Sequence, residues 1–271
     1  MAEDEREALL ESARQGDGPA LEALLKDVEP RIYRFSLRMC GRPEDAQDVL
    51  QETLLAAFRS VRAFRGESSV STWLYAIARS FCIKKRRRSV FAPELVSLDA
   101  ERREAGRSAT PARDPETALA DRELADALQA AISALDPAAR EVLVLRDVEG
   151  LSADEVAGIT GASVSAVKSR LHRARRAVRE RLAPALAPAA LKPGPAGGKP
   201  CPDVVDLLSR HLEGEIERED CAAMERHVAG CARCATACAS LRETLRLCRE
   251  SPLAVPPPVQ DQVRRRLRAL R

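Results

Sequence analysis

The chain has 271 residues, of which 44 are basic and 41 acidic, so any affinity for nucleic acid must come from local segregation of charge and not from the net charge of +3. Its 13 glycines are few for a β-barrel or a nucleotide-binding α/β enzyme, and the abundance of Ala, Leu, Glu and Arg predicts an all-α fold. No apolar run reaches membrane-spanning length and the first residues are too acidic for a secretion signal, so we expect a cytoplasmic protein without membrane contact.

The uneven distributions of aromatic residues and of cysteines divide the chain into segments. All eight aromatic residues lie between Tyr33 and Phe91, and six of the eight cysteines lie between Cys201 and Cys248. Together with the helical periodicity, they predict six segments. These are helical residues 1–90, a linker over 91–116, helical residues 117–183, an Ala/Pro/Gly-rich linker over 184–200, a cysteine-rich domain over 201–250, and a Pro-rich stretch with a basic helix over 251–271.

An acidic stripe is followed by a mixed aromatic and basic block in the first helical segment. Asp45, Asp48 and Glu52 are spaced three and four apart, which places them on one face of a helix. The stretch 64–88 interleaves aromatic, hydroxyl and basic residues, a combination that suits single-stranded DNA because bases stack on rings and phosphates lie along cations. A tryptophan in a helix is often a core residue, so Trp73 alone leaves both roles open.

Residues 151–182 have the proportions of a helix-turn-helix, in which two capped helices flank a turn at 160–163. The second helix carries an apolar stripe, and its cations are expected to project from the other side. Such a face can neutralise phosphates and reach base edges, although a solvated surface helix is the alternative. The cations are Lys168, Arg170, Arg173, Arg175, Arg176, Arg179 and Arg181.

Taken together, these motifs resemble extracytoplasmic-function (ECF) sigma factors. Residues 45–52, 64–68 and 72–75 resemble region 2 of that family, and residues 135–137, 151–157 and 167–175 resemble region 4. The resemblance implies a bacterial initiation factor, not an enzyme, that binds the β′ clamp helices and β flap of core RNA polymerase and directs it to promoter −35 and −10 elements.

The resemblance also implies roles for individual residues. The residues implied to bind polymerase are Asp45, Asp48, Gln51 and Glu52. The residues implied to melt and read the −10 element are Phe64, Arg65, Ser69, Thr72, Trp73, Tyr75, Arg79 and Ser80. Ser80 stands at a position that often carries Asn in the family. Binding of the −35 element falls to Lys168, Ser169, Arg170, His172, Arg173 and Arg176.

In the cysteine-rich segment, Cys201, His227, Cys231 and Cys234 have metal-ligand spacing. Three thiolates and one imidazole form a tetrahedral Zn²⁺ site, and a reducing cytosol disfavours disulfides. Because the segment has about 50 residues and no aromatic side chain, zinc binding, which contributes on the order of 10–16 kcal/mol in small domains, is large enough to decide whether it folds. Reduced cysteines that fill gaps in the core are the alternative.

The same segment resembles the zinc-binding anti-sigma domain, here fused to the sigma-like part as in the CorE-like ECF sigma factors, whose activity depends on metal ions. Cys221, Cys238 and Cys248 are surplus to one site and are candidates for sensing Zn²⁺, Cd²⁺ or Cu ions. Three alternatives to metal sensing remain open for this domain: the surplus cysteines pack in the core, the zinc is purely structural, or the thiols sense redox state.

Two other function classes remain. One is a metal-sensing helix-turn-helix repressor, a function that gives no role to the acidic stripe or to the aromatic-basic block. The other is a metal-storage protein, whose activity would not depend on DNA.

Overall fold

The computed structural model describes residues 3–91, 115–186, 201–250, 255–256 and 265. Helices are the only regular secondary structure among these residues, which confirms the all-α prediction. Within the described residues, no helix combines the length and apolar character of a membrane span. The predicted linkers lie mostly outside the described residues, as does nearly all of the predicted basic helix at 251–271. Three helices reach into the predicted linkers, one ending at Phe91, one beginning at Pro115 and one ending at Leu186.

The described helices form two compact units. The first contains α1 (Glu3–Arg14), α2 (Gly18–Cys40), α3 (Pro43–Ser60), η1 (Val61–Ala63) and α4 (Val70–Phe91), and residues 154–161, which include most of α7 (Ala153–Thr160), group with it. The second contains α5 (Pro115–Ser133), α6 (Pro137–Leu143), the π-helical η3 (Val144–Val148), α8 (Val164–Leu186), α9 (Val204–Leu212), α10 (Arg218–Gly230) and α11 (Ala232–Glu250). The cysteine-rich segment therefore shares a unit with α8.

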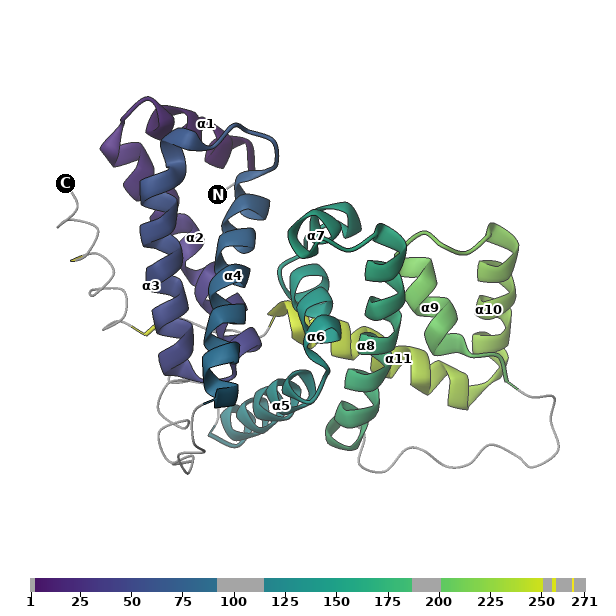
Figure 1. Ribbon diagram of the computed structural model, residues 1–271. Coiled ribbons are helices and arrows are strands. Elements are labelled where there is room, and N and C mark those ends of the chain that lie inside the picture. The colour runs from purple at the N-terminus through teal and green to yellow at the C-terminus, as the bar shows by residue number, and fades with distance from the viewer. Residues whose placement is uncertain (1–2, 92–114, 187–200, 251–254, 257–264, 266–271) are drawn as a thin grey trace. The chain divides into compact units, whose positions relative to one another are not determined.

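In the first unit, α2, α3 and α4 lie side by side (Figure 1). The carboxylate of Asp17 accepts a hydrogen bond from the first turn of α2 and so begins that helix. Gly41 ends it with φ +75°, a left-handed conformation that side chains disfavour, and Pro43 starts α3. The helices meet through a buried aliphatic and aromatic core that includes Leu24 and Leu50.

In the second unit, α8 packs against α5, α6, α9 and α11. The carboxylate of Asp136 caps α6 by accepting from two backbone amides. The predicted apolar stripe of α8 is buried from Val167 to Leu182. Helices α9, α10 and α11 pack on one another around a small core of aliphatic and sulfur-containing side chains, namely Val204, Val205, Leu208, Met224, Cys234, Cys238, Leu241 and Leu245.

Candidate functional site

The four predicted metal ligands converge at one point. Cys201 precedes α9, His227 lies in the last turn of α10, and Cys231 and Cys234 lie at the start of α11. Their donor atoms all lie within 4.8 Å of one another. The Sγ atoms of Cys201 and Cys231 are 3.9 Å apart, and Nε2 of His227 is 3.2 Å from Sγ of Cys234. In the part of the chain that the structure describes, no second group of three or more such side chains meets in this way.

The chemistry of this four-residue cluster fits Zn²⁺. A hydrogen bond from the backbone amide of Cys234 lowers the pKa of the Cys231 thiol, whereas burial raises the pKa of the Cys234 thiol to about 12. A zinc ion at this site would displace the proton of Cys234, since zinc binds thiolates. Because the ligands come from the ends of three helices, a bound ion would cross-link α9, α10 and α11.

The surplus cysteines do not join this cluster. Cys238 and Cys248 are buried in α11, and burial raises the pKa of the Cys238 thiol. Cys221 on α10 is half-buried, with its Sγ 3.4 Å from Nδ1 of His211. Cys238 and Cys248 thus occupy the positions of packing residues.

The acidic stripe lies on α3 beside Lys85 of α4. Nζ of Lys85 is 3.7 Å from Oδ1 of Asp45 and also contacts the carboxylate of Asp48. Burial lowers the pKa of Lys85, but Asp48, Asp45 and Glu52 outweigh it, so the net pKa is raised. Asp48 and Glu52 are exposed, whereas Gln51 is only 5% exposed.

The predicted −10 residues line the start of α4 and the segment before it. The rings of Phe64 and Trp73 are 4.8 Å apart between centroids, and both residues are half-buried. Ser69 Oγ accepts a hydrogen bond from the backbone N–H of Thr72 and so caps α4. Tyr75 is only 1% exposed.

The remaining predicted −10 residues differ in exposure. Arg65 and Ser80 are exposed and Arg79 is half-buried. The burial of Tyr75 has a simple cause, since its ring packs edge-on against Phe35 with 5.4 Å between centroids. Tyr75 therefore contributes to the core of the first unit.

The predicted −35 residues project from α8 in two groups. Ser169 and Arg173 are exposed and Arg170 is half-buried. Lys168, His172 and Arg176 instead contact the cysteine-rich segment. Nε2 of His172 lies 2.6 Å from Oε2 of Glu215, and the guanidinium of Arg176 pairs with Asp203.

Arg175 contradicts the prediction that the cations of α8 project outward, because its side chain is only 2% exposed. It pairs with both carboxylate oxygens of Asp147 at 2.6 and 2.8 Å, and its Nη2 lies 2.7 Å from Oε1 of Glu213. Nη1 of Arg175 also donates to the carbonyl oxygen of Ser209 at 3.2 Å. Glu213 in turn accepts from Arg146 at 3.1 Å. The network thus joins η3 and α8 to the cysteine-rich segment.

Replacing Arg175 with methionine is expected to destabilise the second unit by about 3–5 kcal/mol, because it leaves the carboxylates of Asp147 and Glu213 buried beside a neutral side chain. Urea denaturation of the zinc-loaded protein measures the loss. Arg173→Met is the control, since Arg173 is exposed on the same helix and donates to the carbonyl of Ser169 one turn earlier in α8. Equal stability of the Arg175 variant and the parent would contradict the energetic role of this network.

Known families match both units. The model described as "Sigma-70 region 2" matches residues 24–90, "Sigma-70, region 4" matches 125–178, and "Putative zinc-finger" matches 201–235. RNA polymerase sigma-H factor of Pseudomonas aeruginosa is 31% identical over 190 residues, which cover 69% of this chain and 98% of that protein. The ECF RNA polymerase sigma-E factor of Haemophilus influenzae is 31% identical over 66% of this chain and 95% of its own length. The chain belongs to the ECF sigma factors.

Other comparisons agree with this assignment. The ECF sigma factor SigE of Mycolicibacterium smegmatis is 35% identical over 168 residues, and the match spans 62% of that relative. A solved structure of CnrH in complex with the cytosolic domain of CnrY shares the fold, with a TM-score of 0.50 and 24% identity over 66% of this chain and 97% of that one. As an ECF sigma factor, this protein directs transcription, and it carries a zinc-finger-like domain in addition. Sigma factors are transcription regulators and not enzymes.

Proposed function

We propose that this ECF sigma factor binds core RNA polymerase through α3, melts and reads the −10 element with residues 64–80, and binds the −35 element with α8, while metal binding to the cysteine-rich domain controls its activity in cis. The observation that carries the metal control is that the four-residue cluster belongs to the same compact unit as α8. A metal-dependent change in α9–α11 therefore acts on elements packed directly against α8.

The polymerase contact is supported by the exposure of the stripe on α3. Asp48 and Glu52 are exposed, and Asp45 and Asp48 share Lys85 as a partner. Carboxylates aligned on one helix face suit a basic partner surface. Gln51 is buried and is expected to support the stripe from the core.

The −10 contact is supported by the residues before and at the start of α4. Phe64 and Trp73 lie against each other and both residues are only half-buried, so a flipped base can extend the stack. Arg65 is 84% exposed and can reach a phosphate. Ser69 fixes the first turn of α4 by capping it, which holds Trp73 in position.

Zinc is the metal that we propose, with Cys201, His227, Cys231 and Cys234 as ligands. A closed tetrahedral site of this composition supplies folding energy and no reaction chemistry. Cd²⁺ and Cu ions are thiophilic rivals for the same ligands, and titration of the zinc-free protein with each ion ranks them.

Gel filtration with purified core RNA polymerase tests the proposal. We expect the full chain to co-elute with core polymerase in a 1:1 complex, with one bound zinc per chain measured by mass spectrometry of the metal. A repressor that binds DNA without polymerase would elute separately from core polymerase. That result would contradict the proposed function.

A further inference from the structure

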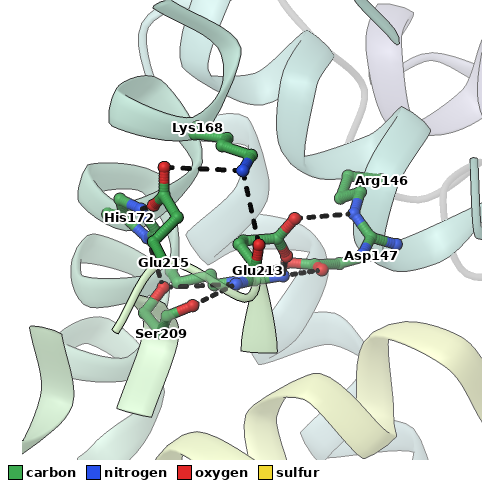
Figure 2. A network of polar contacts seen from close by, with 8 residues as sticks. Arg146, Asp147, Lys168, His172, Ser209, Glu213 and Glu215 are labelled. Carbon is green, nitrogen blue, oxygen red and sulfur yellow. Dashed lines mark hydrogen bonds and ion pairs between the residues drawn. The ribbon is translucent and has the colours of Figure 1, made fainter. Parts of the chain in front are cut away.

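Part of the face of α8 that we assign to promoter DNA is covered by carboxylates of the same chain. Nζ of Lys168 lies 3.6 Å from Oε1 of Glu215 and donates to the backbone carbonyl of Glu213 at 3.3 Å. The ring of His172 lies between Glu215 at 2.6 Å and Ser209 Oγ at 2.7 Å (Figure 2). Two of the side chains proposed to bind DNA therefore meet oxygen atoms of the cysteine-rich segment.

Two carboxylates that contact Lys168, His172 or Arg175 belong to the turn between α9 and α10. Between α9 and α10 the chain reverses at Gly214, whose φ of +68° belongs to the left-handed region that glycine favours. We call residues 213–215 the acidic turn. Glu213 points inward, with a side chain that is 2% exposed and pairs with Arg175 and Arg146, while Glu215 lies over Lys168 and His172.

The burial of Glu213 shows that the acidic turn is docked and does not merely lie nearby. Taking a carboxylate out of water is costly unless hydrogen-bonded cations compensate it, and two arginines do so here. At Glu215, burial raises the pKa, but the hydrogen bond from His172 and the charge of Lys168 outweigh it, so the net pKa is lowered. A third carboxylate, Asp203, pairs with Arg176 one turn further along α8.

From this arrangement we infer that the acidic turn is a built-in competitor of promoter DNA, because the carboxylate of Glu215 and the carbonyl of Glu213 pair with Lys168 and His172, two of the side chains proposed to bind the −35 element. The inference rests on the proposed function and specifies which surface the cysteine-rich domain controls. A phosphate and a carboxylate cannot both occupy the positions around Lys168 and His172, so duplex DNA must displace the acidic turn. Asp203 lies two residues after the ligand Cys201, which connects the docked surface to the metal cluster.

The test measures the affinity of the full chain for DNA. Fluorescence anisotropy with a labelled 30-base-pair duplex of mixed sequence, at low salt, compares wild type with Glu213→Gln/Glu215→Gln. We expect the double variant to bind at least about tenfold more tightly, because its acidic turn competes less well. Glu215→Gln alone keeps the buried Glu213 pair and is expected to bind about two- to fivefold more tightly, which provides a readout if the double variant does not fold.

The matched control changes the same number of charges on an uninvolved surface. Glu219→Gln/Asp220→Asn removes two exposed carboxylates from the first turn of α10 and is expected to bind DNA as wild type does. If this control gains as much affinity as the acidic-turn variant, or if neither variant gains any, the inference is overturned. The proposed function survives that result if the chain still co-elutes with core polymerase, so the two failures are distinguishable.

A second measurement detects the docked turn directly. A zero-length carbodiimide is expected to join the amine of Lys168 to the carboxylate of Glu215 in the wild-type chain, since they lie 3.6 Å apart. Peptide mass spectrometry quantifies the cross-link, and saturating duplex DNA is expected to reduce its yield severalfold. An unchanged yield in the presence of bound DNA, or no cross-link at all, overturns the inference.

Discussion

Replacing Cys231 and Cys234 with serine is expected to abolish zinc binding and to unfold helices α9–α11. The core of these helices is small, with eight buried residues and none of them aromatic. Zinc binding to three thiolates and one imidazole contributes on the order of 10–16 kcal/mol in domains of this size, which exceeds what such a core supplies. Metal analysis and limited proteolysis between residues 201 and 250 measure the two effects, and we expect cleavage there to accelerate by more than about a hundredfold.

The matched control for the ligand variant is Cys221→Ser, which removes a half-buried thiol from the same domain but outside the four-residue cluster. It is expected to keep one zinc per chain and the protease resistance of the parent. Helices α1–α4 belong to the other unit and are expected to keep their stability in both variants. One bound zinc and an intact domain in the Cys231→Ser/Cys234→Ser protein would show that the ligands are misassigned.

Charge reversal at Asp48 and Glu52 is expected to lower the affinity for core RNA polymerase by about a hundredfold or more. Both side chains are exposed, so lysines at these positions are tolerated by the fold but place like charges against a basic partner surface. Such a juxtaposition costs several kcal/mol, and each 1.4 kcal/mol is a factor of ten in affinity. Competition with a labelled sigma factor for core polymerase measures the change.

Glu5→Lys/Glu7→Lys is the control for this experiment, because it reverses two exposed charges of α1 in the same unit. Its affinity for core polymerase is expected to stay within about twofold of wild type. Circular dichroism checks that the Asp48→Lys/Glu52→Lys protein remains helical. A folded variant with wild-type affinity would rule out α3 as the docking helix.

Much of the fold was predictable because local signals determine it. The buried stripe of α8 follows from apolar residues three and four apart, and the cap at Asp136 follows from its position before Pro137. The metal cluster was predictable as well, since His227, Cys231 and Cys234 are close in sequence and span the short break between α10 and α11, which brings their donor atoms together.

What the sequence could not predict depends on packing between distant segments. Arg175 stands among six other basic residues of α8, and only Asp147 and Glu213, which come from η3 and the acidic turn, distinguish it as a buried residue. The docking of Glu215 on Lys168 and His172 joins residues more than 40 positions apart and leaves no periodic pattern. The one available signal was the sequence of the turn itself, in which a glycine separates two glutamates, in a protein whose predicted DNA-binding helix is rich in cations.

The most direct test of the account is transcription by reconstituted polymerase. Core RNA polymerase, the full chain and fragmented genomic DNA of the source bacterium are combined, and the 5′ ends of the RNA are sequenced with zinc-loaded and with zinc-depleted protein. The account predicts a set of start sites that both the zinc-loaded and the zinc-depleted protein give and that core polymerase alone does not give. The RNA yield from these sites is expected to differ severalfold between the two metal states. Transcripts identical to those of core polymerase alone, or yields that do not depend on zinc, would contradict it.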